Sequence, residues 1–188
     1  AQAGALDVVE LAQIRMVRAY GQTEGKRINE RRQAVDLPTR KGSKKAQAVS
    51  ISLTQARKLK SHPDTPQGRR DALLIVLLLE LGLRVGEVAR LCVGDVDLEA
   101  QELTFYRPKV DKTQTHRLDN GLLKAARAYL EIDALASPDA NLLRGSVKGG
   151  VLCGVMSERA ITKRVRSLGE AAGLEGLSAH DCRHFWAT

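Results

Sequence analysis

The sequence predicts a mostly α-helical protein with a small antiparallel β-sheet, an α+β arrangement. Apolar residues recur at helical spacing in most of the chain, whereas residues 95–118 carry strand-like alternation around a polar turn. Gly, Pro, Ser and Asn residues fall between these segments and mark their ends. The 188 residues can form one well-cored domain with some excess chain.

The N-terminal region is predicted to be a helix followed by a basic tether. Residues 5–20 carry apolar side chains at helical spacing. Residues 21–45 have almost no apolar periodicity, contain the breakers Pro38 and Gly42, and cannot bury enough surface to fold alone. We expect this tether to lie along a DNA backbone, and a solvated linker is the alternative. Its candidate DNA-binding residues are Arg27, Arg31, Arg32, Lys41, Lys44 and Lys45.

The next helices are predicted to hold a basic residue at a corner. Residues 54–61 should form a short helix, capped by Ser52 or Thr54 and ended by prolines at positions 63 and 66. Residues 69–81 are so rich in Leu, Ile and Val that their helix should be buried on most of its circumference. Gly82 is expected to stop this helix, and a second short one should follow over residues 85–91. Arg84 therefore lies between two helices, where a rigid frame can aim it at a ligand.

Two short strands are predicted within residues 95–118. Their apolar and β-branched positions include Leu103, Phe105, Tyr106, Thr113, Thr115 and Leu118. The polar residues 108–112 would form the turn between the strands. This region supplies the small antiparallel sheet of the predicted fold.

The C-terminal half is predicted to be helical around an irregular segment. Asn120 should cap a helix over residues 121–135, and the Gly-rich residues 137–154 should be irregular. Residues 157–172 read as a basic amphipathic helix closed by Gly173. Its inward positions would be Ile161, Val165 and Leu168, and its outward positions Arg159, Lys163, Arg164 and Arg166, of which Lys163 and Arg164 are candidate DNA contacts.

The last predicted helix carries a histidine and an arginine on one face. Ser178 should cap this helix, which starts near Ala179. His180 and Arg183 then lie about one turn apart. Asp181 is expected to stabilise the start of the helix rather than to react.

Composition favours a nucleic-acid partner and no metal. Thirty Lys and Arg against 22 Asp and Glu give a net charge of +8, with a pI near 9.7. Such a charge suits a phosphate backbone, although a plain basic surface is the alternative. The three cysteines are widely spaced and include no C-x-x-C pair, so the sequence indicates neither a disulfide framework nor a zinc ribbon and fits a reducing cytoplasm. His180, Cys182 and His184 are too differently oriented on a helix to be expected as metal ligands, and the longest apolar run, residues 72–79, is too short to span a bilayer.

Three motifs in a fixed order carry the chemistry. They are Gly82-Leu83-Arg84-Val85-Gly86-Glu87, then Lys109-Val110-Asp111-Lys112-Thr113, then His180-Asp181-Cys182-Arg183-His184. Opening a phosphodiester needs cations on the nonbridging oxygens, a base for the nucleophile and an acid for the leaving oxygen. Two arginines, a lysine and a histidine can supply all of these except the nucleophile, without a metal or another cofactor. Individually each has an ordinary alternative, such as a helix-capping arginine or a turn lysine.

Residues 52–188 resemble the catalytic domain of the tyrosine recombinases, or phage integrase family. The run from His180 to Thr188 is similar to the family's His-Asp-Leu-Arg-His-x-x-Ala-Thr pattern, with Cys182 where leucine is common. The resemblance implies that Arg84 and Arg183 clamp the scissile phosphate. It implies that Glu87 orients the basic groups and that His180 assists proton transfer. Lys112 best matches the lysine that protonates the leaving oxygen, with Lys109 as its rival.

The resemblance implies site-specific recombination, in which double-stranded DNA is cut and rejoined through a 3′-phosphotyrosine during integration or excision of a mobile element. Residues 1–47 would be the last helix and basic linker of an N-terminal DNA-binding domain, and residues 48–188 an incomplete catalytic domain. Tyr20, Tyr106 and Tyr129 match no nucleophile motif, and Trp186 is expected in the core. We therefore expect a longer parent recombinase, tetrameric on paired sites in a prokaryotic cytoplasm and nucleoid-associated on DNA. The printed chain alone should be monomeric and should bind phosphate without forming the covalent bond.

Three alternatives stay open at this point. One is a non-catalytic DNA-binding protein of the same fold, and another is a type IB topoisomerase, which uses similar residues to relax supercoils. The third is an unrelated basic helical protein that binds RNA, which the aromatic content of 3% disfavours because little stacking surface is available.

Overall fold

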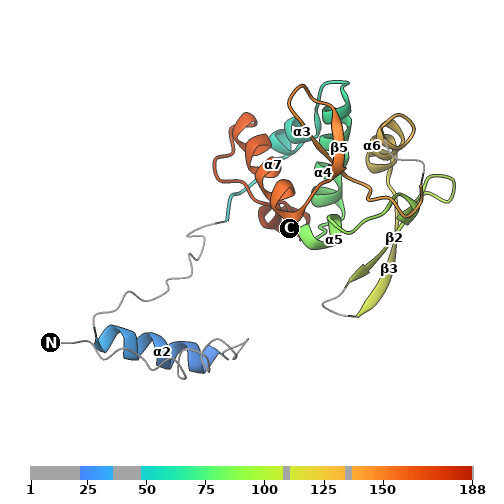
Figure 1. The fold of residues 1–188 in the computed structure, drawn as a ribbon. Helices are drawn as coiled ribbons and strands as arrows, with labels where there is room; N and C mark the ends of the chain where they lie inside the picture. The colour runs from blue at the N-terminus through green and yellow to red at the C-terminus, as the bar shows by residue number, and fades with distance from the viewer. Residues whose placement is uncertain (1–21, 36–47, 108–110, 134–136, 188) are drawn as a thin grey trace. The chain divides into compact units, whose positions relative to one another are not determined.

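The computed structural model describes residues 22–35, 48–107, 111–133 and 137–187 (Figure 1). The chain divides into two units, residues 1–46 and 47–188. Within the described part of the chain, every helix is too short or too polar to cross a membrane.

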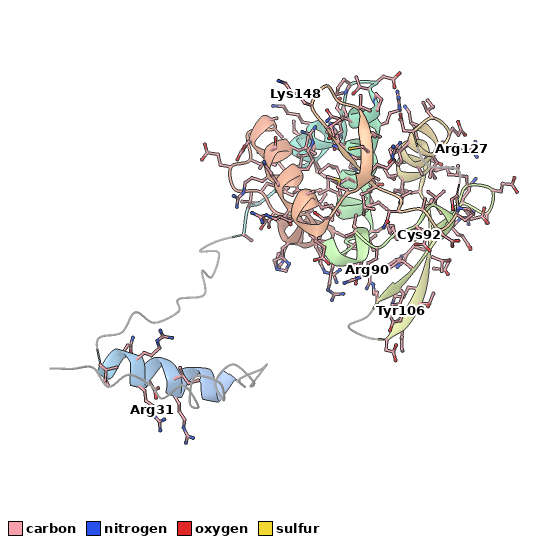
Figure 2. All side chains as sticks on the ribbon, viewed as in Figure 1. Arg31, Arg90, Cys92, Tyr106, Arg127 and Lys148 are labelled. Carbon is pink, nitrogen blue, oxygen red and sulfur yellow. The ribbon has the colours of Figure 1, made fainter. Side chains whose placement is uncertain are left out.

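The described part of the first unit is a helix, α2 (Gln22–Ala34). The prediction of an irregular tether is wrong for these residues. Glu, Gln, Lys and Arg have high helix propensity, so a helix can form here without the apolar periodicity on which the prediction relied, and the breakers at positions 38 and 42 come after its last residue. Arg27 and Arg31 are exposed on α2, as Figure 2 shows for Arg31. The helix predicted over residues 5–20 lies outside the described residues.

The second unit is built around a buried helix, α4 (Pro66–Glu80). Leu74, Ile75 and Leu78 on α4 are fully buried. The surrounding helices are α3 (Leu53–Lys60), α5 (Val85–Val88), α6 (Asn120–Leu130), α7 (Glu158–Ala171) and α8 (Ala179–Ala187) (Figure 1). The predicted fold class, mostly α with a small antiparallel sheet, is confirmed by this arrangement.

Helix caps decide where two of these helices begin. Pro66 was expected to end α3, but it is the first residue of α4, because Thr65 Oγ1 accepts from the amide of Gly68 at 3.1 Å. Proline suits the first turn of a helix, where its missing N–H costs nothing. Asp119, rather than Asn120, caps α6 and accepts from the amide of Leu122 at 2.8 Å. For α3 the cap is Ser52, one of the two predicted candidates.

Three strands form the predicted sheet. The turn η1 (Val93–Asp95) leads to β1 (Val96–Asp97), which pairs antiparallel with β2 (Glu102–Arg107), and β2 pairs with β3 (Lys112–Arg117). In the register of the β2–β3 hairpin, Phe105 lies opposite Gln114 and Arg107 lies opposite Lys112. Lys112 therefore opens the second strand instead of lying in the turn.

The segment expected to be irregular contains a second hairpin. β4 (Arg144–Ser146) pairs antiparallel with β5 (Leu152–Val155). Gly149 and Gly150 have φ values of +94° and +84° and form the turn between the strands. The glycines that suggested irregular chain thus mark a tight hairpin turn, and Leu152 is buried.

Candidate phosphate-binding site

Arg84 is held at the start of α5 by an acidic residue one turn later. The chain leaves α4 through Gly82, whose φ of +57° a side chain would disfavour. Arg84 donates from its backbone N to Glu87 Oε2 and from Nη1 to Glu87 Oε1, both at 2.8 Å. The Glu87 side chain is only 3% exposed, so this carboxylate fixes both the backbone and the guanidinium of Arg84. The predicted position of Arg84 at the corner between α4 and α5 is confirmed.

Arg183 reaches the same corner from α8, which is about 100 residues away in sequence. Its Nη1 donates to the carbonyl oxygen of Gly82. The guanidinium carbon also lies 5.8 Å from the ring centroid of Trp186. Burial lowers the pKa of Arg183, as do the nearby charges of Arg84 and Arg107, while Glu87 raises it. These guanidinium groups are therefore close enough to repel one another.

Trp186 lies beside this site rather than in the core. Its side chain is 46% exposed, so the prediction of a core tryptophan is wrong. A Cβ added at Gly82 would approach the Trp186 ring to 2.7 Å. The indole therefore lies directly against the Gly82 backbone, and this close approach is possible because residue 82 has no side chain.

Arg107 is a site residue that the sequence reasoning missed. It ends β2, and its Nε lies 3.6 Å from Glu87 Oε1, beyond hydrogen-bond range. The guanidinium carbon lies 5.1 Å from the Phe105 ring centroid, and the buried Nε has no hydrogen-bond partner among the described residues. The available signal was its position two residues after Phe105, on the same face of a strand. We call Arg84, Glu87, Arg107 and Arg183 the open arginine cluster.

Lys112 is exposed and lies directly across the hairpin from Arg107. Residues directly opposite in an antiparallel pair point to the same face of the sheet. Lys112 is therefore on the hairpin face that carries Arg107 into the open arginine cluster. Its rival Lys109 lies outside the described residues.

His180 lies one turn before Arg183 on α8 and pairs with His184. The two Nε2 atoms are 3.0 Å apart, and the rings meet edge to face with centroids 4.5 Å apart. Sharing a hydrogen bond requires one ring nitrogen to donate and the other to accept. His184 therefore holds the exposed His180 ring in a defined orientation.

Asp181 anchors the helix that carries these residues. Its Oδ2 accepts from Ser178 N at 2.8 Å and from Ser178 Oγ at 2.6 Å. Its Oδ1 accepts from Val49 N at 3.1 Å, which ties the first described residues of this unit to α8. This buried carboxylate fastens the start of α8, as expected.

The candidate DNA contacts on α7 separate into two kinds. Lys163 is exposed, but Arg164 turns inward and donates from Nε to Oδ2 of the buried Asp71 at 2.8 Å. The prediction that Arg164 projects outward is therefore wrong. Asp71 Oδ1 accepts from Arg70 Nε at 3.0 Å and Nη2 at 2.7 Å. We call Arg70, Asp71 and Arg164 the closed arginine cluster.

The other candidate DNA contacts belong to the first unit. Arg32 on α2 is half-buried, in contrast to the exposed Arg27 and Arg31. Lys41, Lys44 and Lys45 lie outside the described residues. Across the described ranges, no group of three or more His, Cys, Asp and Glu side chains could hold a metal ion.

The hydroxyls of the two described tyrosines are hydrogen-bonded to residues outside the open arginine cluster. Tyr129 is fully buried, and its hydroxyl accepts from Arg144 N at 3.3 Å. Tyr106 precedes Arg107 on β2 and so faces the opposite side of the sheet, where its hydroxyl donates to Asp111 Oδ1 at 2.5 Å. Burial raises the pKa of Tyr129, and the hydrogen bond to Asp111 raises that of Tyr106. Both shifts oppose formation of a phenolate.

Comparison with known protein sequences identifies relatives of the second unit. The model of the phage integrase family matches residues 50–188. Tyrosine recombinase XerC of Haemophilus ducreyi is 32% identical over 126 residues, which are 66% of this chain and 40% of that protein. Tyrosine recombinase XerA of Pyrococcus furiosus is 27% identical over 176 residues, 93% of this chain and 57% of that protein. The chain thus spans 40% and 57% of the length of these two relatives.

Solved structures share the fold at lower identity. A crystal structure of XerA recombinase matches with a TM-score of 0.60 and 22% identity, covering 95% of this chain and 67% of that one. The Tn1549 transposon integrase in complex with circular intermediate DNA matches with a TM-score of 0.59 and 13% identity, covering 94% and 68%. A XerH site-specific recombinase bound to its difH substrate has a TM-score of 0.52 and 16% identity, covering 97% and 59%.

Proposed function

The chain belongs to the phage integrase family, and from this membership we propose that it carries the phosphate-binding site of a site-specific DNA recombinase. The open arginine cluster is the observation that carries the proposal. Arg84 and Arg107 pair with the single buried Glu87 carboxylate, and Arg183 lies close enough for its charge to interact with all three groups, so the cluster has an excess of positive charge. Arginine binds two oxygens of one phosphate through its planar fork and stays protonated throughout.

The proposed reaction opens a DNA phosphodiester by attack at phosphorus. The nonbridging oxygens gain negative charge as phosphorus becomes five-coordinate, and Arg84 and Arg183 would stabilise that charge. Glu87 would keep Arg84 in place. His180, oriented by His184, would assist proton transfer at the nucleophile, because imidazole can both donate and accept a proton.

Lys112 is proposed as the acid for the leaving 5′ oxygen. Its place opposite Arg107 supports this role, because both side chains lie on the hairpin face next to the cluster. Lys109 remains the alternative. The nucleophile would be a tyrosine of the parent recombinase other than Tyr106 and Tyr129, whose positions and raised pKa values are unsuitable.

Double-stranded DNA is the proposed partner. The chain has a net charge of +8, and the Tn1549 integrase and XerH, which share its fold, were solved with DNA. Arg27 and Arg31 on α2 and Lys163 on α7 are exposed and available for phosphate contacts. A tetrameric parent, a monomeric isolated chain and a prokaryotic cytoplasmic location remain predictions.

A suicide DNA substrate tests this function. The purified 188-residue chain should bind the DNA without forming a covalent adduct, whereas a longer recombinase that includes it should form one. Arg84→Ala and Arg183→Ala should each slow adduct formation in the longer protein by about a hundredfold or more, and Arg127→Ala on α6 serves as a surface control (Figure 2). Covalent capture by the 188-residue chain would contradict the proposed source of the nucleophile. Relaxation of supercoiled plasmid without sequence preference would instead indicate a topoisomerase.

A further inference from the structure

Arg107 is not satisfied as a structural arginine would be. Its side chain is 14% exposed, and its Nε is buried without a hydrogen-bond partner among the described residues. Arg107 forms an ion pair with Glu87, but the distance from Arg107 Nε to Glu87 Oε1 is 3.6 Å. The same oxygen already accepts a hydrogen bond from Arg84 Nη1 at 2.8 Å. A largely buried guanidinium without full hydrogen bonding is costly for the fold. Its location therefore needs a reason other than stability.

The charge around Glu87 supplies that reason. Arg84 and Arg107 pair with the Glu87 carboxylate, and Arg183 is bonded to the Gly82 carbonyl close enough to interact with the charges of all three; one carboxylate among three guanidinium groups leaves an excess of two positive charges. The lowered pKa of Arg183 reflects burial and the repulsion from the other two guanidinium groups. A phosphodiester carries one negative charge and gains a second as phosphorus becomes five-coordinate. The excess charge of the cluster therefore matches the transition state better with Arg107 than without it.

Arg107 also connects this charge to the hairpin. It ends β2 and faces Lys112, the first residue of β3. Stacking against Phe105 orients its guanidinium along the face that meets α5. A phosphate held by Arg107 would thus be fixed relative to the strand that carries Lys112.

We propose that Arg107 is a third phosphate-binding arginine, which joins Arg84 and Arg183 on the scissile phosphate and thereby sets the β2–β3 hairpin against it. This inference rests on the proposed function. It adds a residue from the hairpin to the two arginines of the helical motifs. Phosphate binding and placement of the leaving-group acid then depend on the same strand end.

Binding of inorganic sulfate to the 188-residue chain tests the proposal. The dissociation constant would be measured by NMR from the arginine Nε–Hε signals for wild type, Arg107→Gln, Arg84→Gln and Arg183→Gln. Arg117→Gln, an exposed arginine of the same hairpin, is the matched control for the loss of one positive charge. We expect Arg107→Gln to weaken sulfate binding by about tenfold or more, as for a lost charged hydrogen bond. The control should change binding by less than about twofold, as expected for an exposed charge.

Thermal unfolding separates phosphate binding from a structural role. Without sulfate, Arg107→Gln should unfold at the same temperature as wild type or higher, because one of three repelling cations is gone. Loss of stability with unchanged sulfate affinity would show that Arg107 only supports the hairpin, and would overturn the proposal. Arg107→Lys retains the charge and the aliphatic stem, so it provides a folded variant if Arg107→Gln unfolds. Arg107→Lys should bind sulfate more weakly than wild type, because lysine lacks the planar guanidinium that can bind two oxygens at once. Wild-type sulfate affinity in Arg107→Lys would overturn two-oxygen binding by Arg107.

Double-stranded DNA provides an independent readout. Arg107→Gln should lower the slope of log K against log salt by about one phosphate contact. If Arg84→Gln and Arg183→Gln weaken sulfate binding but Arg107→Gln does not, the inference about Arg107 fails and the proposed function stands. If none of the three variants changes sulfate binding, the proposed function fails as well.

Discussion

The closed and open arginine clusters use the same groups for opposite purposes. In the closed cluster, Asp71 is fully buried and each of its two oxygens accepts hydrogen bonds from one arginine. Arg70, 2% exposed, also donates to the carbonyl oxygen of Arg144 at 3.1 Å. In the open cluster, Glu87 accepts a hydrogen bond from the Arg84 guanidinium, whereas Arg107 Nε lies 3.6 Å from the same carboxylate, beyond hydrogen-bond range. Arg183 turns to a backbone carbonyl instead.

These different hydrogen-bond partners distinguish structural arginines from ligand-binding arginines in this fold. Burial alone does not separate them, because Arg70 and Arg107 are both largely removed from solvent. The number of guanidinium groups for each carboxylate oxygen separates the structural arginines from the ligand-binding ones. Where each guanidinium has its own acceptor, the cluster stabilises the fold by itself. Where three guanidinium groups lie close together with only one carboxylate among them, an anion is needed to balance the charge.

The largest expected effect would break the closed cluster. Asp71→Asn removes the only carboxylate between Arg70 and Arg164 in that cluster, and leaves a buried guanidinium without its counter-charge. The free energy of unfolding should fall by about 3–5 kcal/mol, measured by urea unfolding monitored by circular dichroism. The exposed Asp139→Asn is the control and should change it by about 0.5 kcal/mol or less. An equally small loss for Asp71→Asn would show that the closed cluster is not a stability element.

Arg183→Ala tests the opposite expectation in the open cluster. Cleavage by a recombinase that contains this chain should fall by about 10²–10³-fold, as for removal of one preorganised donor from a developing oxyanion. DNA binding should change much less, because most of its affinity comes from other phosphate contacts. Single-turnover cleavage and equilibrium binding would be measured on the same DNA. Equal losses in both would mean that Arg183 merely holds the DNA.

Comparing Lys112 with Lys109 tests which lysine acts as the general acid next to the open arginine cluster. Lys112→Ala should slow cleavage by about a hundredfold or more, as for loss of a general acid. A DNA substrate with a better leaving group at the 5′ position should restore the rate, because that group needs no proton. Lys109→Ala should not be rescued in this way. Rescue of Lys109→Ala alone would assign the acid to Lys109 instead.

Gly82→Ala tests whether backbone geometry supports the open cluster. A side chain at φ +57° should cost about 1–2 kcal/mol. The added Cβ would also approach the Trp186 ring to 2.7 Å and displace α8 from the carbonyl that Arg183 uses. Gly173→Ala, at φ +79° with no atom within 4 Å of the added Cβ, is the matched control. Both variants should lose stability in urea unfolding, and only Gly82→Ala should also lose cleavage.

The smallest expected effects concern two histidines, one beside each cluster. Burial lowers the pKa of both rings; Arg107 lowers that of His116 further, whereas Asp71 opposes the shift at His62. By NMR titration, Arg107→Gln should raise the pKa of His116, and Asp71→Asn should lower that of His62. Unchanged values would mean that the clusters do not act on these rings.

The same shifts predict how stability depends on pH. Because the folded rings bind protons less readily than unfolded ones, stability is complete above the unfolded pKa of about 6.5 and is lost as pH falls below it. The unfolding temperature should therefore decrease from pH 7.5 to pH 6. The double variant His62→Gln, His116→Gln should flatten this decrease. Glu80 contributes to the pH dependence of stability in the opposite direction. Burial raises the pKa of its carboxyl, so protonation of this group as the pH falls favours the folded state.

Much of the fold could be predicted because its signals are local. The apolar run of α4, the amphipathic pattern of α7 and the alternation in β2 are each contained within one segment. The errors came where one residue type serves two local purposes. Pro66 can end a helix or begin one, and the glycines at 149 and 150 fit an irregular loop or a hairpin turn.

The sequence by itself determined the fold class, the family resemblance and the order of the basic motifs. Only the tertiary structure decided which basic residues are available for a ligand. Arg164 is joined to Asp71 across 93 residues of sequence, and Arg183 meets Gly82 across 101. Arg107 is placed in the open arginine cluster by its ion pair with Glu87 of α5. Trp186 packs against the backbone of Gly82 and stays partly exposed instead of entering the core. The physical reason is that a side chain's charge is local, whereas the partner that satisfies that charge comes from whichever distant segment the fold places beside it.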